Sequence, residues 1–291
     1  MVLSSLLSLM QSSPELFIIL VSIFGLLVGS FLNVVIHRLP IMMEREWQSQ
    51  CADLHNKPAP TVEPLTLSRP RSRCPQCNHA VSALENIPVI SYLLLRGQCR
   101  QCKTSISPRY PLIEIFTALL SGMVAWTFGV DWSCLTALIL TWSLITLSFI
   151  DIDHQLLPDS ITLPLIWLGI GISLFGNYAD LQASIIGTMV GYLSLWLVFH
   201  AFKLITGKEG MGYGDFKLLS ALGAWLGWAF LPSIILLSSF VGAIIGITLM
   251  IAGKHQQGTP IPFGPYLAAA GWLMLIWGDD INLLYSSLIL G

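Results

Sequence analysis

The chain has 291 residues, of which 54% are hydrophobic and only 10% are charged, and its formal net charge is −2. A soluble domain of this size usually carries about 25% charged residues, so this composition excludes a large soluble protein whose surface is covered by polar side chains. The sequence instead indicates an all-α polytopic membrane protein. Membrane lipid is an expected partner, and nucleic acid is not.

Apolar runs of about 20 residues, each long enough to cross a bilayer as a helix, recur along the chain. About eight transmembrane helices are predicted, at residues 16–37, 111–129, 133–151, 160–176, 183–204, 215–230, 232–252 and 262–278. No Lys or Arg occurs between Met1 and Phe17, and no small-residue cleavage site follows the first run. A removable signal peptide is therefore not expected.

Basic residues predict the orientation, because ten of the fourteen Lys and Arg lie between Arg38 and Arg109. Cytoplasmic loops of membrane proteins carry the excess of basic residues. This places residues 38–110 in the cytoplasm, together with the turns near 152–159, 204–214 and 253–261. With eight spans, the N-terminus and the C-terminus both lie on the periplasmic side.

A small polar insert interrupts the apolar runs between the first and second spans. It holds Cys74-Pro-Gln-Cys77 and, 21 residues later, Cys99-Arg-Gln-Cys102. Two such turns can supply four thiolates to one tetrahedral ion, which favours a structural Zn²⁺ with no open coordination position. An insert of about 70 residues barely builds its own core, so a metal would supply folding free energy. A disulfide or redox pair is the alternative. Cys51 and Cys134 have no partner pattern.

Ionisable residues at span ends are the informative ones in a membrane chain this poor in charge. Asp151 directly follows an apolar run, and Asp215 opens the sixth predicted span after glycines at 210, 212 and 214. Glycine permits close backbone approach. If the two carboxyl groups meet, they would share one proton and could activate water and protonate a peptide, as in aspartic proteases.

Other interpretations of these acidic residues stay open on spacing alone. Asp153, Asp159 or Asp215 could cap the helix that each precedes. Asp151, Asp153 and His154 could instead hold a divalent metal ion through oxygen and imidazole ligands.

Seven segments, taken in order, give the chain a resemblance to a known family. They are Gly29-Ser-Phe-Leu-Asn-Val-Val-Ile-His-Arg-Leu-Pro40, the paired cysteine turns, Glu85-Asn-Ile-Pro-Val-Ile-Ser-Tyr92, Arg109-Tyr-Pro-Leu-Ile-Glu114, Ile150-Asp-Ile-Asp-His-Gln-Leu-Leu-Pro-Asp159, Lys208-Glu-Gly-Met-Gly-Tyr-Gly-Asp-Phe-Lys217 and Gly258-Thr-Pro-Ile-Pro-Phe-Gly-Pro-Tyr266. The chain resembles the type IV prepilin leader peptidases and N-methyltransferases of Gram-negative inner membranes. One departure is Leu84, where many relatives have Trp.

The resemblance implies an aspartic endopeptidase whose catalytic residues are Asp151 and Asp215. It would cleave the basic leader from type IV prepilins and type II secretion pseudopilins at the cytoplasmic face of the inner membrane. It would then methylate the new N-terminal residue, usually Phe, with S-adenosylmethionine. Candidate residues for methyl transfer are Glu85, Asn86, Gly97 and Arg109, and the zinc ligands are Cys74, Cys77, Cys99 and Cys102.

The expected domains are a first transmembrane helix in residues 1–37, a cytoplasmic zinc-binding domain in 38–110 and a seven-helix membrane peptidase domain in 111–291. A transporter is a competing function, but the acidic residues gather at one face and no predicted span has a charge near its middle. A zinc-bearing scaffold, with aspartates that only cap helices, is another.

Overall fold

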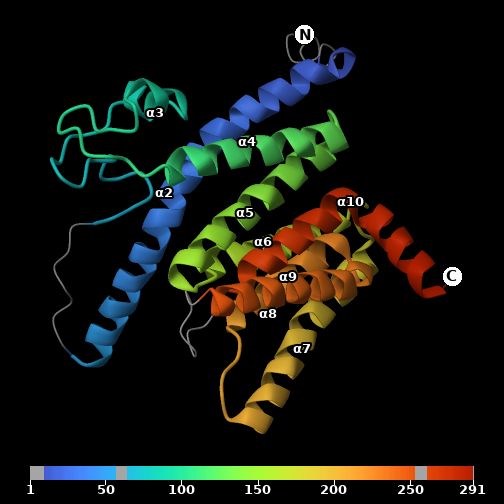
Figure 1. Cartoon of the computed structure of the whole chain (residues 1–291). Helices are drawn as coiled ribbons and strands as arrows, with labels where there is room; N and C mark the ends of the chain where they lie inside the picture. The colour runs from blue at the N-terminus through green and yellow to red at the C-terminus, as the bar shows by residue number, and fades with distance from the viewer. Residues whose placement is uncertain (1–9, 57–63, 253–260, 291) are drawn as a thin grey trace. The chain divides into compact units, whose positions relative to one another are not determined.

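A computed structural model describes residues 10–56, 64–252 and 261–290. Within these residues the regular structure is helical, with two isolated bridges in place of any strand (Figure 1). The predicted all-α class is confirmed. The chain divides into two compact units, residues Met1–Cys134 and Leu135–Gly291. The division into residues 1–37, 38–110 and 111–291 remains a prediction.

The first unit is built on two helices that pack closely, α2 (Pro14–Leu54) and α4 (Arg109–Phe128). Small residues allow their approach: a Cβ added to Gly25 would lie 2.7 Å from Oγ of Ser121, and one added to Gly29 would lie 2.8 Å from Cα of Glu114. Small residues commonly line such contacts between membrane helices. The cysteine-bearing insert between α2 and α4 contains the 3-10 turn η1 (Leu84–Asn86) and the short helix α3 (Ile90–Leu94).

Helix α2 continues past residue 37, where the sequence analysis ends the first span, and reaches Leu54. Pro40 lies inside it and is buried. The following residues favour helix, and Glu44 and Glu46 accept hydrogen bonds from glutamines four positions later. Arg38 anchors the insert to this helix, since its guanidinium donates to the carbonyls of Thr66 at 2.8 Å and Pro70 at 2.7 Å.

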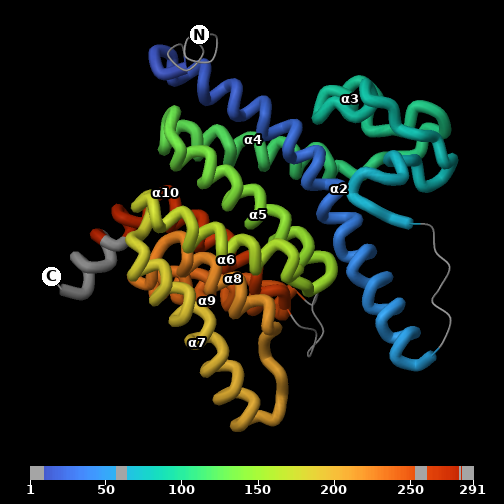
Figure 2. Tube along the Cα trace, turned by 180° about the vertical axis from the view of Figure 1, so that it is seen from behind, coloured from blue at the N-terminus to red at the C-terminus, as the bar shows by residue number. Residues whose placement is uncertain are grey.

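The second unit contains α5 (Trp132–His154) from residue 135 onward, α6 (Asp159–Ser173), α7 (Leu181–Thr206), α8 (Tyr213–Leu226), η2 (Trp228–Phe230), α9 (Leu231–Ile251) and α10 (Gly264–Leu290). Helix α8 is the core element, and it packs against α6, α7 and α10. Its residues from Asp215 to Leu226 are nearly all buried. Figure 2 shows this group of helices from behind.

Close backbone packing and buried hydrogen bonds fix α8 in place. A Cβ on Gly187 of α7 would lie 2.3 Å from the carbonyl oxygen of Gly223. The hydroxyl of Ser184 donates to the carbonyl of Ala224 at 2.6 Å, and the indole of Trp225 donates to the carbonyl of Leu165 at 2.8 Å. Such bonds satisfy polar groups away from water, so the helix that carries Asp215 is held rigidly.

Five helices of the described residues are long and apolar enough to cross a membrane, namely Pro14–Leu54, Arg109–Phe128, Trp132–His154, Leu181–Thr206 and Trp228–Ile251. A sixth apolar helix, Asp159–Ser173, has 15 residues and is shorter. The other predicted spans correspond to α8 and α10. Each of the eight apolar runs thus contains a helix, while eight crossings remain a prediction.

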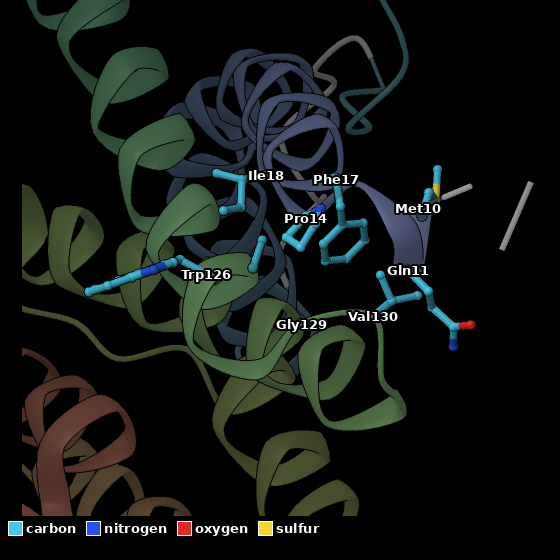
Figure 3. A pocket seen from close by; sticks show the side chains of 9 residues that line it. Met10, Gln11, Pro14, Phe17, Ile18, Trp126, Gly129 and Val130 are labelled. Atoms are coloured by element: carbon cyan, nitrogen blue, oxygen red, sulfur yellow. The ribbon is translucent and has the colours of Figure 1, made fainter. Parts of the chain in front are cut away.

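An apolar groove of about 240 Å³ lies between the start of α2 and the end of α4 (Figure 3). Its lining includes Phe17, Ile18 and Trp126, and no side chain that lines it is titratable. The groove therefore offers no acid, base or metal ligand, and the chemistry of the chain lies elsewhere.

Candidate active site and metal centre

Asp151 lies in the last turn of α5 and is buried. Its Oδ2 accepts a hydrogen bond of 3.0 Å from the backbone N–H of Gly264, which begins α10. A Cβ at position 264 would lie only 2.7 Å from that same oxygen. The first residue of α10 therefore fits this carboxyl group only because it has no side chain.

Asp215 lies in the first turn of α8 and is also buried. Its Oδ2 accepts the backbone N–H of Gly212, the N-cap residue, at 3.3 Å. The alternative interpretation expected Asp215 to be the N-cap residue itself, but the N-cap is Gly212, and Asp215 lies three positions later with its side chain bonded back to it. Capping uses one lone pair of a carboxyl group that has several, so it leaves Asp215 able to act on another molecule.

Leu157 brings the two aspartate segments together. Its side chain lies against Gly214, where an added Cβ would be 2.7 Å from Cβ of Leu157, and against Gly264, where the corresponding distance to Cδ2 is 3.1 Å. Gly214 directly precedes Asp215, and the N–H of Gly264 holds Oδ2 of Asp151, so Leu157 lies between the two aspartate segments. Segments far apart in the sequence therefore meet at one buried place within the second unit.

The other acidic residues of the first motif lie outside this buried place. Asp153 and His154 are exposed. Asp159 is in the first turn of α6, and both of its carboxylate oxygens lie 2.7 Å from Nζ of Lys217. Its side chain thus joins α6 to α8, and no side-chain hydrogen bond caps α6. Among the described residues, the only group of metal-ligating side chains is the cysteine cluster, so nothing supports a metal at Asp151, Asp153 and His154.

The four cysteines of the insert converge, with all four Sγ atoms within 4.8 Å of one another. Two of the separations are 3.7 Å, between Cys74 and Cys102, and 3.9 Å, between Cys77 and Cys99. Zn–S bonds of about 2.3 Å in a tetrahedron put sulfur atoms about 3.8 Å apart. All four are free cysteines, so the arrangement fits a tetrahedral metal ion and not a disulfide.

The two turns that supply these cysteines share one local geometry. In the first, the N–H of Cys74 bonds to the carbonyl of His79; in the second, the N–H of Cys99 bonds to the carbonyl of Thr104. The residue after each second cysteine, Asn78 or Lys103, has a positive φ. Hydrogen bonding with the side chain and backbone of Thr104 lowers the pKa of the Cys102 thiol to about 6, whereas burial and the neighbouring thiols raise the pKa of Cys77 to about 12. A thiol with a low pKa is a ready metal ligand.

The four residues proposed for methyl transfer lie in the first unit, in different surroundings. The Glu85 carboxylate accepts the N–H of Ser82 at 2.8 Å and contacts His79 at 3.3 Å and Arg100 at 3.8 Å. Asn86 is exposed. Gly97 is buried with φ +67°, and a Cβ there would lie 2.9 Å from the ring of Tyr92. Arg109 begins α4 and is half-buried.

Three residues at the candidate site escaped the sequence analysis, namely Leu157, Lys217 and Gly264. Each belongs to a motif that the resemblance had already singled out. Leu157 and Lys217 lie within six and two positions of an aspartate, so proximity in sequence was a usable clue. Gly264 is 113 residues from Asp151. A glycine followed by proline before an apolar run indicates a helix start, but not which side chain that helix meets.

Comparison with known proteins gives a consistent result. A model described as the type IV leader peptidase family matches residues 138–247, and one described as the bacterial peptidase A24 N-terminal domain matches residues 23–128. A prepilin leader peptidase/N-methyltransferase of Stutzerimonas stutzeri is 58% identical over 95% of this chain and 96% of its own length. Proteins of the same description from Pseudomonas aeruginosa and Neisseria gonorrhoeae are 55% and 50% identical, over 96% and 90% of this chain and 97% and 91% of their own. No solved structure matches the chain.

Proposed function

This chain belongs to the type IV leader peptidase family, and from that premise we propose that Asp151 and Asp215 are the catalytic carboxyl groups with which it removes the leader peptide of prepilins. Leader cleavage and N-methylation are the two activities that the family and the names of its relatives support. The observation that carries the proposal is that both carboxyl groups are buried within one compact unit, in two segments that pack on either side of Leu157.

Cleavage would follow the chemistry of a carboxyl pair that shares one proton, because like charges at close range do not both ionise. The ionised member takes a proton from a water molecule whose oxygen attacks the scissile carbonyl carbon. The neutral member gives its proton to the carbonyl oxygen, forming a tetrahedral diol. The C–N bond then breaks, the leaving nitrogen receives a proton from the pair, and one diol hydroxyl returns its proton as the new carboxyl group forms.

The backbone around the pair supports these roles. Asp151 accepts the N–H of Gly264 and Asp215 accepts the N–H of Gly212, so each carboxyl group keeps one oxygen fixed by the main chain. Fixed orientation lowers the cost of reaching the transition state. Burial of both carboxyl groups keeps bulk water away, which strengthens the electrostatic interactions within the site.

A substrate with a basic leader before an apolar helix suits a site at a membrane surface. We assign the loops that follow α2, α5, α7 and α9 to the cytoplasmic side of the inner membrane, and both termini to the periplasmic side, on the distribution of Lys and Arg. The apolar helix of a prepilin or pseudopilin would then lie in lipid while its scissile bond reaches the aspartates.

We assign the cysteine cluster to one structural Zn²⁺ ion. Its four sulfur atoms close the coordination sphere, so the metal supplies folding free energy to the insert and takes no part in peptide cleavage. The methyl donor is S-adenosylmethionine, for which Glu85, Asn86, Gly97 and Arg109 remain candidate contacts. Asn86 is the most accessible of them, whereas Gly97 also has a structural reason to be glycine, beneath Tyr92.

The catalytic assignment is tested by incubating purified Asp151→Ala and Asp215→Ala variants with a prepilin in detergent and following the size of the product on a gel. Both variants should leave the leader attached. The matched control is Asp153→Ala, which removes an exposed carboxylate two residues from Asp151 and should cleave normally. Normal cleavage by either Asp151→Ala or Asp215→Ala would exclude the carboxyl pair.

Methylation is tested on the mature product, by mass spectrometry of its N-terminus with and without S-adenosylmethionine. The expected mass increase requires the donor, and it should persist when an already cleaved pilin is offered to Asp151→Ala. Failure of that variant to methylate a cleaved substrate would show that the two activities share their residues.

A further inference from the structure

Four large apolar side chains of the cysteine-bearing insert are exposed, although no membrane-length apolar run occurs in the insert. Leu84 in η1 is 76% exposed, and Ile90, Leu93 and Leu94 in α3 are 56%, 68% and 78% exposed. These four residues are called the α3 patch below. Residues 90, 93 and 94 share one face of a helix, since residues three and four apart are neighbours. A patch of this kind marks an interaction surface.

Hydrogen bonds hold this patch close to α2 and α4, the two helices of the first unit that are long enough to cross a membrane. The N–H of Val89, immediately before α3, donates to Oε2 of Glu114 at 2.8 Å, and Glu114 is in the second turn of α4. The side chain of Asn33 donates to the carbonyl of Tyr110 at 3.1 Å, which fixes the start of α4 against α2. Both views show α3 beside the middle of α2, near the start of α4, and not beyond the far end of α2 (Figures 1 and 2).

The backbone conformation of Val89 indicates that contacts with α4 determine the position of α3. Its φ is +59°, a conformation in which a β-branched residue is strongly disfavoured. Such conformations persist where surrounding contacts impose them. Here the contact is the buried Glu114 carboxylate, which accepts the N–H of Val89. The bond sets the point at which α3 leaves the helix pair.

The surface next to the patch identifies what covers it. Leu112, Ile115 and Phe116 are exposed on α4, a helix that is apolar enough to cross a membrane, so we expect them to face lipid. Basic side chains follow α3 directly, and Arg96, Arg100 and Lys103 are exposed. An apolar face with Arg and Lys close to it in the chain has the composition of elements that lie in the interface of a bilayer containing anionic lipid.

We propose that the α3 patch is an interfacial anchor, which inserts Leu84, Ile90, Leu93 and Leu94 among the lipids of the leaflet at the start of α4 while the adjacent basic residues contact anionic phospholipid headgroups. The anchor holds the metal-binding insert against the membrane surface, beside the helices that carry it. The occupant is the bilayer itself and not a protein.

The test uses the full-length protein in nanodiscs of phosphatidylethanolamine and phosphatidylglycerol, with the photoreactive residue benzoylphenylalanine at position 94. Irradiation followed by mass spectrometry should give lipid adducts, at a yield close to that at position 119, an exposed leucine on α4. Position 54 is the matched negative control, because Leu54 is 82% exposed at the end of α2. That helix is about 60 Å long, about twice the hydrocarbon thickness of a bilayer.

Several-fold more lipid adduct at position 94 than at position 54 supports the anchor. A yield at 94 equal to that at 54, or adducts at 94 formed with a protein in place of lipid, would overturn it. Replacing phosphatidylglycerol by phosphatidylcholine should lower the yield at 94 and leave that at 119 unchanged. An equal decrease in adduct yield at both positions would show that the basic residues do not bind anionic headgroups.

Discussion

The cysteine cluster and the aspartate pair are assembled in opposite ways. Each half of the cysteine cluster is a four-residue turn with its own hydrogen bonds, and the two halves are separated by a short stretch of chain. The aspartate pair needs α5, the α5–α6 connection, α8 and α10, which are spread from Asp151 to Gly264. We expect the site made of local turns to depend on the proposed metal ion, and the site made of distant helix ends to depend on packing between helices.

Loss of the metal is expected to disturb the fold most strongly, and the disturbance should be confined to the first unit. The insert has little core of its own, so its fold depends on the four thiolates. Cys77→Ser should therefore abolish stoichiometric zinc and leave residues 70–105 unprotected from hydrogen exchange. Metal analysis and exchange mass spectrometry measure both effects.

The control for this change is Cys51→Ser, which removes an exposed cysteine from the same unit and should leave the zinc content unchanged. Full zinc content in Cys77→Ser would contradict the assigned ligand set.

Gly264→Ala is expected to reduce the rate constant of leader cleavage by about 10²-fold, because displacement of a catalytic group by about 1 Å has effects of that size. The added Cβ would lie 2.7 Å from Oδ2 of Asp151, so the carboxyl group must move. We expect kcat to fall while KM for the prepilin stays the same. Gly171→Ala is the matched control, because a Cβ at that helical glycine would meet nothing within 4 Å. Equal kcat values for the two variants would exclude Gly264 from the site.

Loss of the Lys217–Asp159 ion pair should have a smaller effect on leader cleavage, because both side chains are partly exposed to solvent. Lys217→Ala and Asp159→Ala should each lower kcat/KM for cleavage by up to about fivefold. The pair joins the starts of α6 and α8, so the double variant should be no worse than either single one. Lys208→Ala, in the exposed loop before α8, serves as the control. Additive losses in the double variant would show that the two side chains act separately.

Glu85→Gln should have the smallest effect, and its effect should depend on pH. The N–H of Ser82 is the main cause that holds the pKa of Glu85 below its usual value, with help from His79. A lowered pKa in the folded state means that the ionised carboxylate stabilises the insert above the unfolded value of about 4.3. That contribution is lost as the pH falls through the folded value.

The variant should therefore be less resistant to proteolysis of the insert at pH 7 and should match the wild-type protein once the pH is below the folded-state pKa of Glu85. The wild-type protein and the variant are compared at the same pH, so that any release of metal at low pH affects both proteins alike and does not contribute to the difference between them. A difference that grows on acidification would contradict the assigned role of the carboxylate.

The two sites also differ in how far sequence could predict them. Residue type and spacing sufficed to predict that Cys74, Cys77, Cys99 and Cys102 lie together, because two short turns can each present two thiols to one point. Periodicity and composition likewise predicted the helices, but not that α2 continues through Pro40 to Leu54. The residues after Pro40 are polar, which indicates exposure to water, but polar residues also form helices. The hydrogen bonds from Arg38 to Thr66 and Pro70, which show that the chain returns to α2, appear only in the structure.

The sequence could identify the two aspartates, but not the residues that surround them in the fold. Their position at span ends came from the sequence, and the choice of Asp151 over Asp153 came from a family resemblance. Burial now separates them, since Asp151 is buried beside Gly264 and Asp153 is exposed. No local pattern encodes the contact of α10 with α5, or the place of Leu157 between two glycines, because both depend on packing between helices.

The central claim is that Asp151 and Asp215 act as one unit. Single-turnover rates of prepilin cleavage by Asp151→Asn, Asp215→Asn and the double variant test it most directly. Groups that act together show strongly non-additive losses, so each single variant should lose nearly all activity and the double variant should be no slower than either. Losses that multiply in the double variant, or a single variant that cleaves at the wild-type rate, would contradict the account.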